Sequence, residues 1–152
     1  MFRIRPVERE DYPEWLNVYQ VYAAYYGVEL SEMGIANTWS WLMDIRHVME
    51  GIVAESDGEV VGLAHFRAMP SPLRGQEIGF LDDVIVLPEY RSYGIGEGLL
   101  EYIRSHGTEA GWGVVRWITR DNNYSARRVY DRVAKRTNWV TYEMDCYRKS
   151  ID

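Results

Sequence analysis

The stretch LDDVIVLPEYRSYGIGEGLL, residues 81–100, runs from an apolar segment through a glycine-containing turn into a helical pattern. The segment before Pro88 is apolar on both faces, which is typical of a strand covered on two sides. Because side chains alternate along a strand, Asp82 and Asp83 are expected to point to opposite faces. A buried carboxylate is costly unless a partner or a ligand satisfies it. The stretch therefore predicts a central strand of a layered α/β sheet that also serves a ligand.

The turn in this stretch has the features of an anion site. Gly94 and Gly96 let the backbone approach another group closely, and the helix that follows offers unpaired N–H groups. Arg91 adds a fixed positive charge, and phosphate is the ligand that suits such a site best. The alternative is a tight turn that needs glycine for its own geometry. For the two glycines alone, that alternative is favoured.

Length and composition predict one globular domain, residues 1–152, with 47% hydrophobic and 26% charged residues. The net charge of -6 argues against nucleic-acid and anionic-membrane partners and leaves a cationic substrate open. A single cysteine, Cys146, excludes a disulfide framework within the chain and is expected to be an inert core thiol. The three histidines lack metal-ligand spacing, so no metal is expected. The first residues lack the apolar centre of a signal peptide, and a cytoplasmic location is expected.

The rest of the chain predicts a mixture of helices and strands. Asp57 and Gly58 form a strong hairpin signal between two strand patterns. Asp11 is expected to cap the first helix and Gly27 to end it. The order of elements predicts an α/β (α+β) fold with helices on a mixed sheet. The predicted strands cover about residues 2–7, 51–56, 59–69, 77–87, 113–119 and 139–147, and the predicted helices about 11–27, 31–45, 94–110 and 121–136.

The spacing Arg-x-x-Gly-x-Gly at residues 91–96 resembles the signature of the GNAT acetyltransferase superfamily at a strand–turn–helix junction. A second motif lies in the last predicted helix, where Asn123, Ala126 and Tyr130 match the family's Asn-x-x-Ala-x-x-x-Tyr. The resemblance covers about residues 77–147. It implies a central, mostly antiparallel mixed sheet that is splayed in the middle, flanked by helices and wedged open by acetyl-CoA. After Tyr130 the chain departs from the family, because DRVAKRTNW replaces a short glycine-phenylalanine turn.

The resemblance also implies roles for single residues. The strand backbone and Asn123 would bond the pantetheine arm of acetyl-CoA, while a helix N-cap is the alternative reading of Asn123. Tyr130 would be the general acid that protonates the departing thiolate, and a core tyrosine is its alternative. The cofactor-binding residues implied in this way are Val84, Ile85, Val86, Arg91, Ser92, Tyr93, Gly94, Ile95, Gly96, Glu97, Asn123, Ala126 and Tyr130.

The acidic pair is similar to a stretch of the diamine acetyltransferases, in which acidic residues lie on this strand near the reacting amine. A primary amine, whose pKa in water is about 10.4, is protonated at neutral pH and must lose a proton before it attacks. Asp82 is preferred as the base or water-positioning residue, with Asp83 as its neighbour, although simple pairing with arginines explains either carboxylate. Aromatic and acidic residues of the first two helices can line a cation pocket, but most aromatics at helical spacing belong to a core. The residues concerned are Tyr22, Tyr25, Tyr26, Glu29, Trp39 and Trp41.

Together these features predict an acetyl-CoA-dependent N-acetyltransferase that acts on a primary amine of a small molecule by direct attack in a ternary complex. A protein or peptide acetyltransferase and a non-catalytic CoA-binding module are the alternatives. The expected partners are acetyl-CoA and the amine, without nucleic acid or membrane. The family is often dimeric, so a homodimer and a monomer both remain open.

Overall fold

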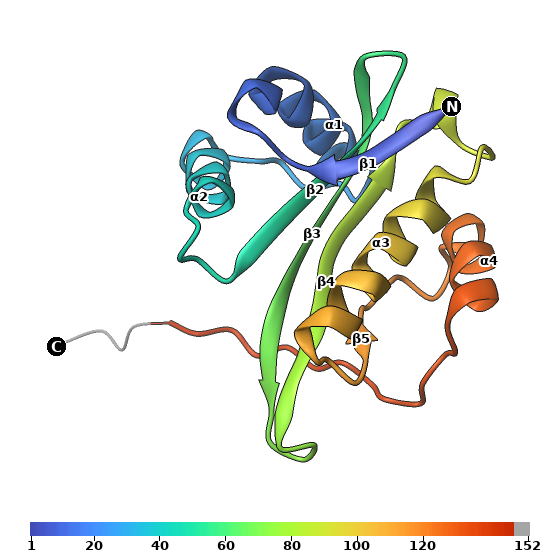
Figure 1. Ribbon diagram of the computed structural model, residues 1–152. Coiled ribbons are helices and arrows are strands. Elements are labelled where there is room, and N and C mark those ends of the chain that lie inside the picture. The colour runs from blue at the N-terminus through green and yellow to red at the C-terminus, as the bar shows by residue number, and fades with distance from the viewer. Residues whose placement is uncertain (148–152) are drawn as a thin grey trace, which may run out of the picture.

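The computed structural model describes residues 1–147 and shows a five-stranded sheet with helices on both faces (Figure 1). The strands follow the order β1-β2-β3-β4-β5; the first four are antiparallel, and β5 runs parallel to β4. This architecture confirms the predicted fold class. The strands are β1 (Phe2–Pro6), β2 (Met49–Ser56), β3 (Glu59–Ser71), β4 (Gln76–Val86) and β5 (Val115–Arg116); the α-helices are α1 (Tyr12–Tyr25), α2 (Glu32–Met43), α3 (Ile95–Ala110) and α4 (Tyr124–Val133); η1 (Arg9–Asp11) and η2 (Pro88–Tyr90) are short 3-10 turns.

Local sequence signals place several of these elements correctly. Asp57 and Gly58 have φ angles of 50° and 82°, as the tight turn of the β2–β3 hairpin requires. The Ser31 hydroxyl accepts a hydrogen bond from the Gly34 amide at 3.0 Å and caps α2. Gly27, with φ of 69°, follows Tyr26, the C-cap of α1.

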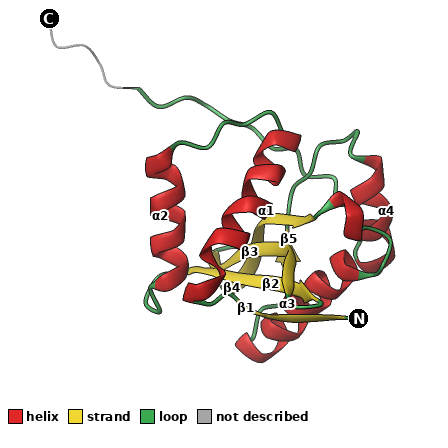
Figure 2. Ribbon diagram, turned by 90° about the horizontal axis from the view of Figure 1, so that it is seen from above, coloured by secondary structure: helices red, strands yellow, loops and turns green. Residues whose placement is uncertain are grey.

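Two hydrophobic clusters fill the faces of the sheet. On one face, α1 and α2 cover the sheet, and Trp15 packs with Leu63 and other strand residues. On the opposite face, α3 and α4 cover it, and Leu99 packs with Phe66. Figure 2 shows the sheet between these two helical layers. Within residues 1–147, no helix combines the length and the apolar character that a membrane span requires.

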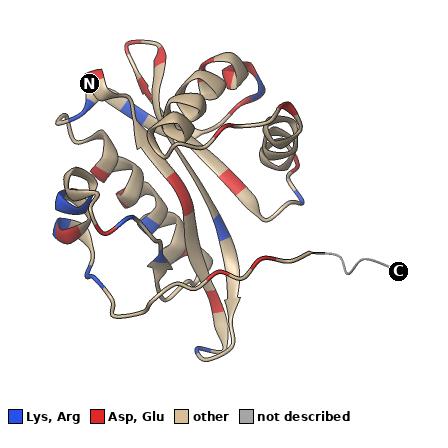
Figure 3. Ribbon diagram, turned by 180° about the vertical axis from the view of Figure 1, so that it is seen from behind, with Lys and Arg blue, Asp and Glu red and all other residues tan. Residues whose placement is uncertain are grey.

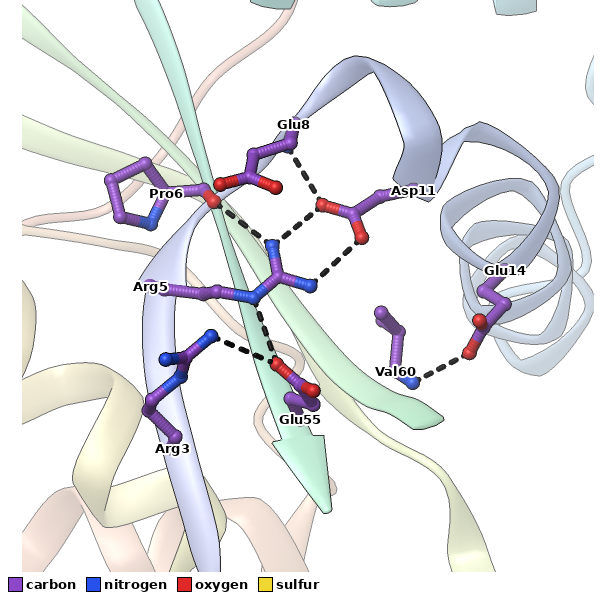
Figure 4. A network of polar contacts seen from close by, with 8 residues as sticks. All are labelled: Arg3, Arg5, Pro6, Glu8, Asp11, Glu14, Glu55 and Val60. Carbon is purple, nitrogen blue, oxygen red and sulfur yellow. Dashed lines mark hydrogen bonds and ion pairs between the residues drawn. The ribbon is translucent and has the colours of Figure 1, made fainter. Parts of the chain in front are cut away.

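A polar network joins β1 to the start of α1 (Figure 4). The Arg5 guanidinium donates to both carboxylate oxygens of Asp11, at 2.8 and 2.9 Å, and to Glu55 at 2.9 Å. Asp11 also accepts a hydrogen bond from the Glu8 amide at 2.7 Å. The hydrogen bond from Arg5 holds the pKa of Asp11 below its usual value despite burial. Asp11 stands at the N-cap position of α1, as expected, but its side chain caps the preceding 3-10 turn instead.

The end of the chain differs from the prediction. Residues 134–147 have no regular secondary structure, so the strand predicted over residues 139–147 does not form in the protomer. After α4 this part of the chain first passes beside β5, and only its last residues run away from the helices and the sheet (Figures 1 and 2). Cys146, expected in the core, is exposed. The strand predicted over residues 113–119 is reduced to β5, because a strand extends only as far as a neighbouring strand bonds it.

Candidate active site

A β-bulge in β4 decides where the acidic pair points. The register with β3 shifts between His65 and Phe66 and leaves Asp82 as the extra residue. Asp83 Oδ2 lies 2.8 Å from His65 Nδ1, and Asp82 Oδ2 lies 2.9 Å from Arg67 Nε. His65 and Arg67 are two residues apart in β3 and share one face. The prediction that the carboxylates point to opposite faces is therefore wrong, because the bulge turns both toward the face that α1 covers.

Asp83 belongs to a buried polar network with α1. Trp15 Nε1 donates to His65 Nε2 at 2.9 Å, so the neutral imidazole carries its proton on Nδ1 and donates it to Asp83. The Tyr19 hydroxyl donates to Asp83 Oδ2 at 3.3 Å. Burial acts to raise the pKa of Asp83, but hydrogen bonds from His65 and from the hydroxyls of Tyr22 and Tyr19 outweigh it and hold that pKa below its ordinary value. Asp83 is consequently an anion at neutral pH.

A row of tyrosines on α1 and at its C-cap connects the acidic pair with Asn123. The rings of Tyr19 and Tyr22 stack with centroids 5.9 Å apart, and Tyr22 meets Tyr26 edge-on at 5.0 Å. Asn123 Nδ2 donates to the Tyr26 hydroxyl at 3.3 Å, and Asn123 Oδ1 accepts from the Tyr25 hydroxyl at 3.2 Å. Asn123 occupies the N-cap position of α4 without a side-chain cap bond. Its side chain instead ties the end of α1 to the start of α4.

Tyr130 lies on α4 close to this row. Its ring packs edge-to-face on Trp117 with centroids 5.4 Å apart. Burial, together with the charges of Tyr26 and Tyr25, raises the pKa of Tyr130 to about 12. The phenol therefore stays protonated at neutral pH. Proton transfer to a thiolate whose thiol has a pKa of about 8.5 is uphill, so Tyr130 is better suited to donate a hydrogen bond to a departing sulfur than to protonate it outright.

The sheet opens between β4 and β5. β5 pairs with β4 only at Gly79 and Phe80, so residues 81–86 of β4 have no partner in β5. Val84 and Val86 lie in this unpaired part. A strand edge with free backbone groups can accept an extended ligand arm as an added strand. The opening has the position that the family resemblance implied for acetyl-CoA.

The start of α3 lies beside the open edge of β4. Arg91 Nε donates to the Val86 carbonyl at 3.2 Å and holds the turn against the strand. Ser92 and Gly94 have φ angles of 71° and 84°, so Gly94 meets a requirement of the turn itself. The turn does not require a glycine at position 96, because the φ angle of Gly96 is not positive. An added Cβ at this position would contact only Val86 Cγ2, at 3.9 Å. The space beside Gly96 and the first amides of α3 thus suits an anion such as a diphosphate.

The other predicted cofactor residues differ in what their side chains do. Ile95 is buried in the core cluster of α3, so it can offer only its backbone amide. Tyr93 is exposed, and the Glu97 carboxylate lies 3.6 Å from Arg132 Nη2. Ile85 packs into the α1-side cluster, whereas Ala126 is half-buried on α4.

The aromatic residues expected around the acceptor divide into two groups. Trp39 packs on Trp15 in the core at 4.9 Å, and Trp41 stacks on His47 at 5.2 Å, so neither joins the acidic pair. The three tyrosines, Tyr22, Tyr25 and Tyr26, belong to the α1 row, and Glu29 is exposed after α1.

Sequence reasoning missed three residues of this region. His65 is the partner of Asp83, and Arg67 is the partner of Asp82. Arg120 lies with its guanidinium 4.9 Å from the centroid of the Tyr26 ring and donates to the Tyr26 carbonyl at 2.9 Å. Helical spacing signalled the tyrosine row, whereas no local signal pointed to these cross-strand and loop partners.

A large cavity of about 1720 Å³ lies between β5, α3, α4 and the chain that follows α4. It reaches the candidate site at Tyr130, while none of its lining residues comes from the bulge or from the turn before α3.

Comparisons with known proteins identify the family and agree with the fold. The model of the Acetyltransferase (GNAT) family matches residues 14–134. The D-amino-acid N-acetyltransferase HPA3 of Saccharomyces cerevisiae is 24% identical over 95% of this chain and 91% of its own length. An uncharacterized N-acetyltransferase of Archaeoglobus fulgidus is 32% identical over 84% of this chain and 88% of its own. The aminoglycoside N-acetyltransferase AAC(6')-Iy, solved with a bisubstrate analogue, superposes with a TM-score of 0.80 at 18% identity, covering 96% of this chain and 99% of that one. The family match and the fold together show that this chain belongs to the acetyltransferase (GNAT) family, whose fold uses acetyl-CoA.

Proposed function

We propose that this acetyltransferase transfers the acetyl group of acetyl-CoA to a primary amine of a small molecule, by direct attack in a ternary complex. The observation that carries the proposal is the arrangement of β4. Its edge is open beside the start of α3, and its bulge presents two carboxylates on the α1 face. One strand thus offers a groove for the cosubstrate and an anionic site for the amine.

In this proposal the turn before α3 holds the diphosphate of acetyl-CoA. Amides of residues 92–97 face the phosphate oxygens, and Arg91 adds its charge. The free edge at Val84 and Val86 bonds the pantetheine arm, and one of these amides polarises the thioester carbonyl. Asn123 has both amide protons engaged by Tyr26 and Thr119, so it takes part as an acceptor through its remaining oxygen lone pair.

The acidic pair receives the amine as an ammonium ion. Asp83 is enclosed by its donors, whereas the Asp82 carboxylate is half-buried and is held by Arg67. Asp82 therefore has room to accept a proton from the amine, directly or through a water. The free amine attacks the thioester carbon, the C–N bond forms, and the C–S bond breaks. Tyr130 donates a hydrogen bond to the thiolate as it leaves.

A small acceptor is favoured over a protein by two observations. The anionic site lies beside a row of tyrosine rings, which attract a cation by their faces. The yeast relative is named for D-amino acids, and the solved neighbour is named as an aminoglycoside N-acetyltransferase. Both are compounds with amines on small frameworks. An amino acid would also need a cation for its carboxylate, and Arg120 lies at the end of the tyrosine row.

Thiol release from acetyl-CoA tests the proposal. The panel contains polyamines, D- and L-amino acids, aminoglycosides and peptides with free N-termini. We expect turnover with at least one small amine and a much lower kcat/KM with the peptides. Turnover restricted to peptides would establish the protein acetyltransferase instead. Tight acetyl-CoA binding without turnover on any acceptor would support the non-catalytic module.

A further inference from the structure

The charges around the acidic pair suit an acceptor that brings a single positive charge. Arg67 Nε lies 2.9 Å from Asp82 Oδ2 and neutralises that carboxylate. Asp83 receives hydrogen bonds from the neutral His65 imidazole and from the Tyr19 hydroxyl, and neither donor cancels its charge. The acidic pair together with Arg67 therefore carries one net negative charge. One ammonium group balances this charge, whereas a second ammonium group finds no counter-charge in the cluster.

Pairing across the sheet places a second arginine on the same face. Arg67 of β3 lies opposite Phe80 of β4, and Phe80 lies opposite Arg116 of β5. Residues that lie opposite each other in neighbouring strands share one face of the sheet. Arg116 therefore faces the side on which Arg67 bonds Asp82. This side consequently holds more positive charge than the acidic pair requires.

Arg120 adds a third cation where the tyrosine row ends. Its guanidinium lies 4.9 Å from the centroid of the Tyr26 ring, and Nη2 donates to the Tyr26 carbonyl at 2.9 Å. An arginine that satisfies a carbonyl at the end of a helix explains this hydrogen bond. However, a guanidinium has five N–H donors, and the bond to Tyr26 uses only one of them. Within residues 1–147, neither Arg116 nor Arg120 takes part in an ion pair, so both charges are available to an anionic group.

The tyrosine row separates the acidic pair from Arg120. Tyr19 donates to Asp83 at one end of the row, and the Tyr26 ring contacts Arg120 at the other end. Tyr19 and Tyr26 are seven residues apart along α1 and its C-cap, which corresponds to about 10 Å at the rise of an α-helix. An α-amino acid carries its amine and its carboxylate on the same carbon, so it does not reach both ends. An acceptor that reaches both has several atoms between its charged groups, and the tyrosine rings offer apolar surface to such a chain.

We propose that the acceptor is a small zwitterion, an ω-amino acid whose primary amine binds the acidic pair and whose carboxylate binds Arg120. The Tyr26 carbonyl and ring hold the Arg120 guanidinium in place, and its remaining donors form a charge-assisted pair with the carboxylate. Arg116 adds positive charge on the same side, which disfavours a second ammonium group. The inference rests on the proposed function and narrows its class of acceptor. It makes Arg120 a residue that determines specificity, while the attack on the thioester belongs to the amine at the other end.

Acceptor binding to the full-length protein, measured by NMR titration with saturating coenzyme A, tests the inference without acetyl transfer. Three probes share a chain of six carbons: 6-aminohexanoate carries both charges, hexylamine carries only the ammonium group, and 1,6-diaminohexane carries two ammonium groups. The dissociation constant should be smallest for 6-aminohexanoate, about fivefold or more below that of hexylamine, because the arginine–carboxylate pair is added. It should be largest for the diamine. In a series from glycine to 6-aminohexanoate, the affinity should rise with the length of the chain.

Charge reversal at the proposed carboxylate site completes the test. Arg120→Glu should invert the ranking, so that the diamine binds more tightly than 6-aminohexanoate. Arg120→Gln, which keeps a donor for the Tyr26 carbonyl, should abolish the preference and serves where the reversed variant does not fold by circular dichroism. Arg128→Glu is the matched control, because it makes the same charge change at an exposed position on α4, beyond the opposite face of the sheet, and it should keep the wild-type ranking.

Several outcomes would overturn the inference. They are equal wild-type affinities for 6-aminohexanoate and hexylamine, tightest binding of the diamine or of glycine, no binding of any probe, and a wild-type ranking in folded Arg120→Glu. Thiol release is read separately with the same compounds. A lack of turnover on small amines would refute the proposed function, while the ranking of dissociation constants still decides whether Arg120 selects a carboxylate.

Discussion

Asp83 is a buried charge whose partners come from two different layers of the protein. His65 on β3 and Tyr19 on α1 both donate to the same carboxylate oxygen, and Trp15 fixes the tautomer of the histidine. A carboxylate removed from water is tolerated only when donors replace the lost hydration. The network therefore fixes the position of α1 on the sheet as well as the charge of the site.

Replacement of this carboxylate should change both stability and its dependence on pH. Because the folded-state pKa of Asp83 is lowered, its contribution is fully present above the unfolded-state value of about 3.9 and is lost as the pH falls through the folded-state value. At pH 7, Asp83→Asn should lower the free energy of unfolding by about 1–3 kcal/mol. Urea titrations from pH 2.5 to 7 measure both effects. Asp131→Asn, at an exposed position on α4, is the control and should match wild type.

Removal of the Tyr130 hydroxyl should affect turnover and spare cosubstrate binding. A hydrogen-bond donor that acts on the departing sulfur contributes mainly in the transition state, so Tyr130→Phe should lower kcat by about 10²-fold. The affinity for acetyl-CoA should change little. Tyr124→Phe provides the control, because that tyrosine lies on the same helix but is exposed. Equal losses of kcat and of acetyl-CoA affinity in Tyr130→Phe would contradict the donor role.

The junction of β4 with α3 combines two glycines that have different tasks. Gly94 supports a left-handed turn, whereas Gly96 leaves space in front of the helix. An alanine at position 96 adds helix propensity of about 0.5 kcal/mol and creates no close contact. Gly96→Ala should therefore hold or raise the melting temperature while it weakens acetyl-CoA binding by tenfold or more, as isothermal titration can measure.

Gly98→Ala gives the contrasting result on the same helix. A Cβ at position 98 would lie 2.9 Å from Phe2 Cε2, so this variant should lose stability and, where still folded, bind acetyl-CoA normally. Unchanged acetyl-CoA affinity in Gly96→Ala would count against a diphosphate site at this turn.

Charge is distributed unevenly over the whole molecule. The net charge is -6, yet basic residues gather on α4, as Figure 3 shows. The acidic pair lies on the opposite face of the sheet, where α1 covers it. Under the proposed function, a cationic acceptor would approach the acidic pair and the anionic cosubstrate would approach the basic side of the molecule.

Ionic strength should accordingly change the encounter with a charged acceptor. We expect kcat/KM for a polycationic amine to fall several-fold between 20 mM and 500 mM salt, because screening shortens the reach of the protein field from about 20 Å to a few ångströms. The value for a zwitterionic amino acid should change much less. Stopped-flow or initial-rate measurements at saturating acetyl-CoA give the comparison. Equal salt dependence for both acceptors would show that the acidic face does not steer the amine.

Signals within a few neighbouring residues were enough to predict the β2–β3 hairpin and the start of α3. The two family motifs were also recognisable from the sequence. The Asp57–Gly58 turn and the glycines before α3 act through their own φ angles and through neighbours a few residues away. The sequence likewise placed Tyr22, Tyr25 and Tyr26 together in the first helix as candidates for the acceptor site. Such features depend on contacts between residues that are close together in the sequence, so they can be predicted without knowledge of the fold.

Tertiary structure alone decided the orientation of the acidic pair and the state of the last segment. The bulge at Asp82 is a property of the β3–β4 register, and it brings Asp83 to His65, 18 residues away. The alternating pattern of residues 139–147 encodes a strand, but a strand needs a neighbour whose backbone bonds it, and the described part of the protomer provides none. Pairing across a sheet is a relation between distant segments, and for this reason it appears only once the chain is folded.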